Sequence, residues 1–433
     1  METINNAALT ADERLAGLRA FVATGPSFPD WLPESNNHIH TIYSFSPYTP
    51  AAAALRARQV GLPVIGSVDH DSLAAAAETR AACEILGMGA VTGLEIRTRM
   101  PAQFADRKLN SPDARGMAYL TVQGIPASAR ERVAEFLRPV REARRARTLA
   151  MADRANEILV GLGLTPFDPE ADMMARSQFA TGGTVTERHL LAAMSSALIA
   201  GFGRGEALVA GLSSMGISLP DAMRDQLGDE SNPFLDYDLL GVLKAEYLDR
   251  IYTQPDEELV DAADVVALAD EIGAIAMYPY LGDVTASVTG DKKAEHFEDA
   301  FLDELFDAIV AMGFRAVTYM PPRNTPEQLA RIHALAVRHG LLEVSGVDIN
   351  QPRQSFECPE LRDPALAFLN EATWALVAHE AVADADRGLA LLLPRRMTAA
   401  ELDARVARYA PVGRALAAGL APDEAVELLK EES

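Results

Sequence analysis

The chain has 433 residues, of which 49% are hydrophobic and 23% charged, a composition typical of a globular protein with ample chain to bury a core. Its 62 acidic residues outnumber its 39 lysines and arginines, which gives a formal net charge of -23. An electric field of that sign repels nucleic-acid backbones, so we expect no nucleic-acid partner. The negative net charge still allows a small anionic substrate to bind in a locally positive pocket.

The sequence carries no sign of membrane insertion or export. No uncharged apolar run reaches the roughly 18 residues that a membrane span needs, and the N-terminal segment lacks the basic and apolar regions of a signal peptide. The two cysteines, Cys83 and Cys358, form neither a disulfide framework nor a paired metal-ligand motif. We therefore expect a soluble, cytoplasmic protein without a membrane partner, and leave its oligomeric state open.

Taken in chain order, residues 1–35 predict a helical preamble that ends in a proline-rich turn. Over 36–127, short apolar runs alternate with helical stretches. The predicted strands there are 63–68, 90–96 and 117–122. This alternation of strand and helix is typical of βα units, which form a parallel sheet or barrel.

The alternation stops at residue 128. The segment 128–254 is almost wholly helical in its pattern, and its arginine-rich helix over 130–154 is expected to form salt bridges with the acidic surface. The βα alternation returns over 255–355, and 356–433 is again helical. The predicted fold is an α/β barrel, interrupted by a helical cap and followed by a helical C-terminal tail.

Two histidines, His38 and His40, lie two residues apart in a segment expected to be extended. Side chains alternate between the faces of a strand, so both imidazoles project from the same face. Such a pair at the end of a strand can chelate a metal, although two polar residues at a strand edge are the alternative.

Polar side chains also follow three other predicted strands. Asp69, His70 and Asp71 follow one of them, Glu95 ends the next, and Asp348 ends a later one. The carboxyl ends of barrel strands meet at one rim, where enzymes of this architecture carry out their chemistry. These positions predict a metal site at the rim with Asp69 as a catalytic group, whereas Asp71 fits equally a turn that caps the next helix.

The order and spacing of these motifs resemble those of the PHP (polymerase and histidinol phosphatase) family. The matching segments are 38–44, 69–72, 93–95, 185–189 and 346–352. The resemblance implies a distorted seven-stranded, TIM-like (β/α) barrel, the PHP barrel, and a metal site that hydrolyses phosphate esters. The metal ligands that it implies are His38, His40, His70, Glu95 and Asp348.

Four of the family's nine ligand positions carry other residues in this chain. They are Phe45, Tyr119, Tyr278 and Asn350. The family's geometry keeps one complete shell, so the resemblance implies one or two divalent ions, and histidine and carboxylate ligands accept manganese, iron or zinc. Because Tyr278 and Asn350 are polar, we expect both to face His70 and Glu95 and to bind substrate.

Basic residues supply candidate anion ligands. Thr184 or Thr186 can cap a helix whose first turn contains Arg188 and His189, where free N–H groups favour an anion. We expect Arg188 to hold a phosphate or carboxylate and His189 to donate a proton to the leaving group, although an ordinary helix start is the alternative. Further candidates for substrate binding, each more often a solvated charge, are Lys292, Arg323 and Arg353.

Three functions remain open at this point. The first is a metal-dependent phosphoesterase that hydrolyses a small phosphate ester or nucleotide with a metal-activated water. The second is an amidohydrolase-like enzyme that uses one metal to cleave a C–N or C–O bond. The third is a non-catalytic PHP-like protein that binds a ligand, which the four replaced positions favour.

Overall fold

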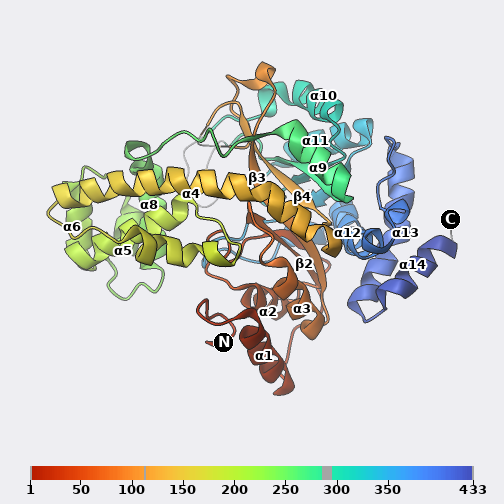
Figure 1. Ribbon diagram of the computed structural model, residues 1–433, viewed down its shortest axis with the longest axis horizontal. Helices are drawn as coiled ribbons and strands as arrows, with labels where there is room; N and C mark the ends of the chain where they lie inside the picture. Colours follow the sequence, from red (N-terminus) through yellow and green to blue (C-terminus); the bar gives the residue numbers. More distant parts are fainter. Residues whose placement is uncertain (1, 112–113, 285–294, 432–433) are drawn as a thin grey trace.

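The computed structural model describes residues 2–111, 114–284 and 295–431 (Figure 1). Its sheet runs in the order β1-β2-β3-β4-β6-β7-β8, with β5 paired to β3. The strands are β1 Asn36–Ile39, β2 Val64–His70, β3 Gly89–Arg99, β4 Met117–Gln123, β5 Val260–Asp261, β6 Ile275–Tyr280, β7 Ala316–Tyr319 and β8 Leu342–Ser345.

The sheet curls until its two ends meet. A parallel bridge joins Ile39 of β1 to Ile349, which follows β8. The His40 N–H donates to the Ile349 carbonyl at 3.0 Å, and the Ile349 N–H donates to the His38 carbonyl at 3.0 Å. The predicted distorted barrel of seven strands is therefore confirmed, and it closes through a single bridge rather than a full ladder.

Strand β4 departs from the prediction. It pairs antiparallel with both β3 and β6, whereas the other neighbouring strands pair parallel. A parallel connection needs a crossover, usually a helix, to carry the chain back. Among the described residues of this connection, 100–111 and 114–116, the helical element is the short 3-10 turn Ala102–Phe104. The expectation of a parallel strand here was wrong because these described residues contain no crossover helix.

Helices cover the outside of the barrel in two groups. One group packs against β1 and β2 and the other against β3, β4, β6 and β7, each in its own apolar cluster. These helices are α1 Ala11–Ala23, α2 Pro50–Gln59, α3 Ala76–Leu86, α9 Ala262–Ile272, α10 Leu302–Met312 and α11 Pro326–His339. The helix α11 begins with a capping box, in which the Thr325 side chain accepts from the Gln328 N–H at 3.2 Å.

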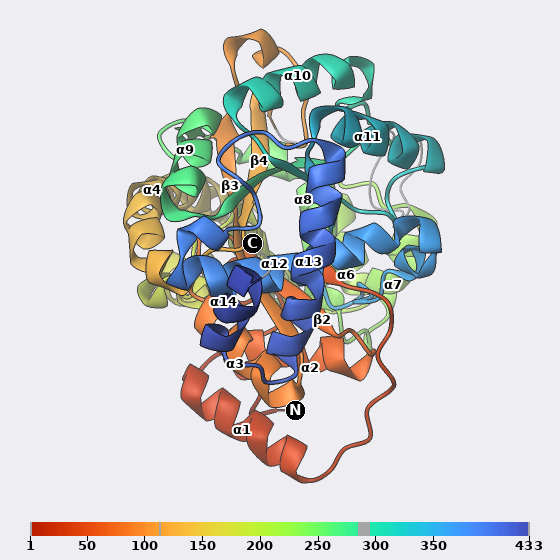
Figure 2. The same cartoon turned by 90° about the vertical axis from the view of Figure 1, so that its right-hand side faces the viewer.

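The C-terminal tail forms the floor of the barrel. Its helices are α12 Ala367–Ala385, α13 Ala399–Ala417 and α14 Pro422–Glu431. The side chains of Val64, Val91 and Met277 pack against Trp374 and Leu376 of α12 in one cluster. Figure 2 shows these three helices gathered on one side of the molecule. These helices therefore close one end of the barrel with apolar side chains. The polar residues described below lie at the opposite end, which we call the upper rim.

The segment between β4 and β5 forms a helical lobe with its own apolar core, which we call the cap. Its helices are α4 Arg130–Gly161, α5 Glu187–Phe202, α6 Glu206–Ser214, α7 Asp221–Gly228 and α8 Leu235–Glu246. The long helix α4 runs from beside the barrel into this lobe, opposite α12–α14 (Figure 1). None of the described helices has the length and apolar content that crossing a bilayer requires.

A buried carboxyl group outside the rim makes stability depend on pH. Glu298 is fully buried and accepts hydrogen bonds from the Tyr278 hydroxyl at 3.0 Å and from the Gly282 N–H at 3.1 Å. Burial raises the pKa of Glu298 from its ordinary value of 4.5 to about 7.

We expect the free energy of unfolding to fall as the pH rises from about 4.5 to about 7, because only the folded state keeps the Glu298 proton in this window. The slope is at most about 1.4 kcal/mol per pH unit. Urea denaturation of Glu298→Gln measures it: the variant loses this slope, whereas the exposed control Glu327→Gln keeps it. An unchanged slope in Glu298→Gln would contradict the assignment.

Candidate metal centre and its cap

Two histidines and a glutamate converge at the upper rim of the barrel. His38 lies in β1, His40 directly follows it, and Glu95 lies in β3. One ligand atom from each residue lies within 4.8 Å of the other two. The His38 Nε2 lies 3.6 Å from Glu95 Oε1, and the His40 Nε2 lies 3.9 Å from Glu95 Oε2. Ile39 packs among the outer helices, which leaves its two neighbouring histidines facing inward.

Asp348 joins this group from the other edge of the sheet. Its Oδ1 lies 3.3 Å from His40 Nε2 and accepts a hydrogen bond from the Asn350 amide at 2.6 Å. Gly346 makes this approach feasible, because a Cβ there would lie 2.7 Å from the backbone nitrogen of His38. The glycine of the Gly-Val-Asp motif thus lets the chain after β8 lie against β1.

His70 completes the rim. Its buried Nδ1 lies 3.0 Å from Glu95 Oε2 yet has no hydrogen-bond partner. The rings of His40 and His70 lie 4.7 Å apart. An unpartnered ring nitrogen beside a carboxylate and further imidazoles is a donor set that manganese, iron and zinc accept. These residues fit a divalent cation, and the buried group of His38, His40 and Glu95 could hold it.

The protonation states agree with that fit. Burial lowers the pKa of His40 to about 3, which keeps its ring neutral at physiological pH. Burial opposes ionisation of Glu95, but the neighbouring His70 and His38 outweigh it and lower the pKa of Glu95 to about 2. A neutral ring, as in His40, and an ionised carboxylate, as in Glu95, are the forms that bind metals.

Phe45 occupies one of the four positions at which the sequence departs from the resemblance described above. Its backbone has a φ of 89°, a left-handed conformation that strains a residue with a Cβ. Its ring packs edge-on to His189 at 5.0 Å and lies 5.8 Å from the ring of Tyr237 in the cap. Phe45 therefore joins the β1 loop to the cap through ring contacts.

His189 requires a correction. It lies in the first turn of α5, and Thr186 is the N-cap, as predicted. However, the Thr186 N–H donates to His189 Nδ1 at 3.0 Å, and the Arg176 carbonyl accepts from the same ring. Burial lowers the pKa of His189 to about 3. With both ring nitrogens engaged and the ring neutral, His189 is a helix cap rather than the predicted proton donor.

Asp69 also makes structural contacts. It is buried, and its carboxylate accepts from the Thr41 N–H at 2.7 Å, the Thr41 hydroxyl at 2.6 Å and the Ser44 hydroxyl at 2.6 Å. In β2 it alternates with His70, so it faces the β1 loop rather than the rim's interior. These contacts hold the loop that follows His38 and His40.

Tyr278 points the wrong way for its predicted role. Met277 belongs to the cluster inside the barrel, whereas Tyr278 packs in the outer cluster beneath α9 and α10. Its hydroxyl donates to Glu298 at 3.0 Å. The prediction that Tyr278 faces His70 and Glu95 was wrong, because a strand turns neighbouring side chains to opposite faces. Asn350, in contrast, reaches the site through Asp348.

Of the predicted anion ligands, Arg188 lies at the rim, whereas Arg323 and Arg353 contact loops and the cap elsewhere. Arg188 lies at the rim, with its guanidinium 5.8 Å from the centre of the Phe45 ring. Arg353 pairs with Asp238 of α8 at 2.8 Å, and Arg323 donates to the Leu281 carbonyl at 3.1 Å. These two basic residues hold loops in place. Lys292 lies outside the described residues.

A network of buried ion pairs joins the cap to the barrel. Its members are Asp71, Arg97, Arg144, Arg147, Glu187 and Glu258. Arg144 Nη1 lies 2.9 Å from Asp71 Oδ2, and Arg147 Nε lies 2.6 Å from Glu258 Oε2. Arg97 Nη1 reaches Glu258 at 3.2 Å. Three cations balance three carboxylates here, so the rigid connection leaves no net charge.

The sequence signalled this network only in part. Arg97 lies two residues after Glu95 in the same strand, so the sequence could have predicted that the two side chains lie on one face. Arg144 and Arg147 sit in an arginine-rich helix that we expected to pair with surface acids, and nothing local marks them as buried. Asp71, a candidate helix cap, pairs with Arg144 instead.

A small cavity of about 60 Å³ lies between the rim and the cap. The barrel contributes His70, Arg97 and Tyr119 to its lining, and the cap contributes Arg144, Glu187, Arg188 and Lys244. The Tyr119 hydroxyl accepts from Arg97 Nε at 3.1 Å, and its ring lies 5.4 Å from that of His70. The cavity is several times larger than one water needs, and cations dominate its charged lining.

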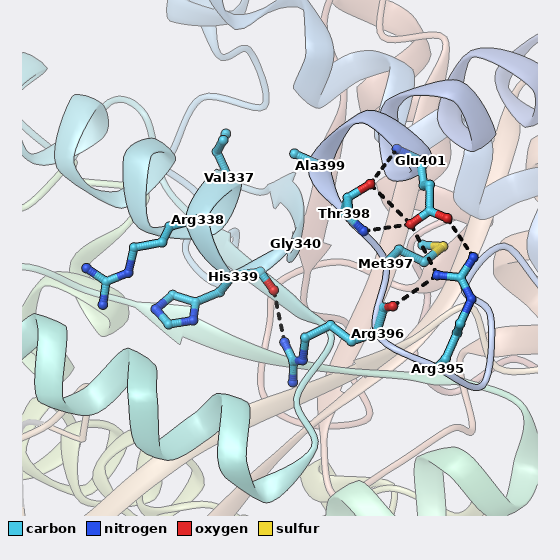
Figure 3. Close-up of a pocket in the computed structure, with 10 residues that line it drawn as sticks. All are labelled: Val337, Arg338, His339, Gly340, Arg395, Arg396, Met397, Thr398, Ala399 and Glu401. Carbon is cyan, nitrogen blue, oxygen red and sulfur yellow. Dashed lines mark hydrogen bonds and ion pairs between the residues drawn. The ribbon is translucent and has the colours of Figure 1, made fainter.

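A larger hollow of about 430 Å³ lies away from the rim, between the end of α11 and the start of α13. Figure 3 shows that Arg395 and Arg396 in its lining have partners. Arg395 Nη2 lies 2.6 Å from Glu401 Oε1, and Arg396 Nη1 donates to the His339 carbonyl at 3.0 Å. Arg396 Nη2 donates to the Val310 carbonyl at 2.9 Å. The contacts of these two arginines join the loop before α13 to α10, α11 and α13.

No protein-family model and no curated protein match the chain. A crystal structure of a protein described as a metal-dependent phosphoesterase from Bifidobacterium adolescentis aligns with 79% of this chain and 98% of its own, at 20% identity and a TM-score of 0.48. An amidohydrolase from Chromobacterium violaceum, with bound sulfate and no metal, aligns with 74% of this chain and 88% of its own, at 16% identity and a TM-score of 0.47. The assignment of the fold rests on the strand order and pairing given above.

The buried network predicts a large cost for losing one member. Arg144→Met leaves Asp71 buried without its partner, so we expect a loss of about 3–5 kcal/mol in the free energy of unfolding, measured by urea denaturation. Arg145→Met, at the next position of α4, breaks an exposed pair with Glu170, which lies beyond this helix, and should cost less than about 1 kcal/mol. Equal losses in the two variants would refute the proposed role of the network.

Proposed function

We propose that this chain is a metal-dependent phosphoesterase that hydrolyses a small phosphate ester, such as a nucleotide. The observation that carries the proposal is the position of His70, which contacts Glu95 of the candidate metal centre and also lines the basic cavity. A substrate with one atom at the metal centre would therefore place its neighbouring atoms among cationic side chains.

These positions suggest which residues would bind the cation and which would bind the phosphate group. His38, His40, Glu95 and Asp348 would hold the cation, with His70 as a further ligand. A divalent cation there would supply Lewis-acid polarisation of a phosphoryl oxygen and activation of water. Arg188 and Lys244, on the cap side of the cavity, would bind the remaining phosphoryl oxygens and neutralise their charge.

The size and charge of the protein favour a small substrate. The cavity of about 60 Å³ accommodates one small anionic group rather than a polymer. The net charge of -23 repels a polynucleotide, whereas the local cations attract a compact anion. The cap also shields the cavity from bulk water, which strengthens charge interactions within it.

A hydrolase that cleaves a C–N or C–O bond with one cation is the second candidate. Among the residues that the structure describes, the group of ligand atoms meeting at one point consists of His38, His40 and Glu95. Three protein ligands with an open position suffice for such chemistry. A non-catalytic protein that binds a ligand at the same rim is the third.

Metal binding tests the shared premise of both enzymes. His38→Ala removes one ligand, so we expect loss of stoichiometric manganese or zinc binding in equilibrium dialysis followed by elemental analysis. His296→Ala, which alters a histidine whose side chain is 90% exposed, serves as the control and should bind as the wild type does. Equal binding by both variants would exclude His38 as a ligand.

Arg188 tests the choice of substrate. With manganese present, we expect Arg188→Gln to raise the KM for phosphate esters about tenfold or more, the worth of a hydrogen bond to a charged group. Arg224→Gln, the same change at an exposed position of the cap, should leave KM unchanged. Steady-state assays over nucleotides, sugar phosphates and N-acyl amino acids decide the class, and turnover of the amides alone would favour the second candidate.

A further inference from the structure

We infer that Ser44 and Asp69 are positioning residues that fix the hydrogen of His40 on Nδ1 and so turn the lone pair of Nε2 toward the metal centre. The inference deepens the proposed function, because it rests on the rim as a metal site and not on the identity of the substrate. It gives Asp69 a role different from direct catalysis.

Three side chains form a continuous line of hydrogen bonds. His40 Nδ1 lies 3.1 Å from the Ser44 hydroxyl oxygen. That oxygen lies 2.6 Å from Asp69 Oδ1. All three side chains are buried, with relative exposures of 2% for His40, 1% for Ser44 and 1% for Asp69, so water does not compete for these contacts.

The position of each hydrogen follows from the donors available. Asp69 Oδ1 already accepts the Thr41 N–H at 2.7 Å, and an amide can only donate. Oδ1 is thus an acceptor, and the hydrogen in its contact with Ser44 comes from the serine hydroxyl. A hydroxyl has one hydrogen, so the Ser44 oxygen must accept from His40, which therefore carries its hydrogen on Nδ1.

This arrangement leaves the other nitrogen of the ring as a lone-pair donor. His40 Nε2 faces Asp348 Oδ1 at 3.3 Å and Glu95 Oε2 at 3.9 Å. This lone pair and the two carboxylate oxygens are three donors that suit a cation placed between them. Hydrogen-bond partners that orient metal-ligating histidines in this way raise their basicity and affinity for the metal.

Asp69 also controls where Ser44 stands. Its second oxygen, Oδ2, accepts from the Thr41 hydroxyl at 2.6 Å, so one carboxylate holds both ends of the tight turn over 41–44. The strained Phe45 follows directly. The carboxylate thus fixes the serine, and the serine fixes the imidazole.

Nitrogen NMR of histidine-labelled, metal-free protein tests the tautomer directly. We expect the His40 ring to carry its hydrogen on Nδ1 in the wild type and to become a mixture of tautomers in Ser44→Ala. Ser46→Ala, the same change two residues away, serves as the control and should leave the His40 signals unchanged, because the Ser46 hydroxyl accepts from the Tyr48 N–H instead. A wild-type His40 with its hydrogen on Nε2 would overturn the inference.

Zinc titration by calorimetry supplies the second readout. We expect Ser44→Ala to weaken binding about tenfold or more, and Ser46→Ala to bind as the wild type does. Asp69→Asn should retain most of the affinity, since its amide oxygen can still accept from the Thr41 N–H and the Ser44 hydroxyl and only the contact that Oδ2 accepts from the Thr41 hydroxyl is lost, whereas Asp69→Ala should lose the affinity. Unchanged zinc affinity in both Ser44→Ala and Asp69→Ala would overturn the inference.

The two readouts separate this inference from the proposed function. A wild-type protein that binds no divalent cation contradicts the proposed function, and the NMR result then still decides the tautomer. A wild type that binds zinc with His40 protonated on Nε2 contradicts the positioning role alone.

Discussion

The buried ion pairs between the barrel and the cap are the constraint on which the site depends. Arg144 and Arg147 enter from α4 and meet Asp71 and Glu258, which lie beside the barrel rim. Charges in such surroundings are costly unless they are paired, so each member keeps the others in place. These ion pairs fix the position of the cap relative to the candidate metal ligands. Arg188 of the cap lines the same cavity as His70.

The alternation of side chains along the strands places the candidate metal ligands on the inward face and the residues that support them on the outward face. In β2 and β3, His70, Glu95 and Arg97 face inward, where they meet the metal centre and the cavity. Asp69 faces the neighbouring loop and holds Ser44, while Leu94 packs among the outer helices. Strands β2 and β3 therefore supply the candidate metal ligands His70 and Glu95 and the cavity residue Arg97 on one face. On the other face β2 supplies Asp69, which positions Ser44.

The sequence predicted the features that depend on local periodicity. The pairing of His38 with His40 follows from the strand pattern, and the structure brings both together with Glu95 and Asp348. Glu95, which was predicted to end its strand, lies within β3, which continues to Arg99. The outward Tyr278 follows from the alternation of side chains along β6, and the His189 cap follows from a contact with Thr186 three residues earlier, so both lay within reach of local patterns. The reversed β4 depends on tertiary packing, which local patterns do not encode. The burial of arginines in α4 is likewise set by partners distant in the chain.

The most direct test of a metal centre at the barrel rim is a crystal structure of protein grown with manganese or zinc, with anomalous data recorded at the metal edge. The account predicts a peak between His38 Nε2, His40 Nε2 and Glu95, about 2.0–2.3 Å from each ligand atom, with Asp348 also in contact. Fully soaked crystals with no peak at the rim, or with the metal bound elsewhere, would contradict it.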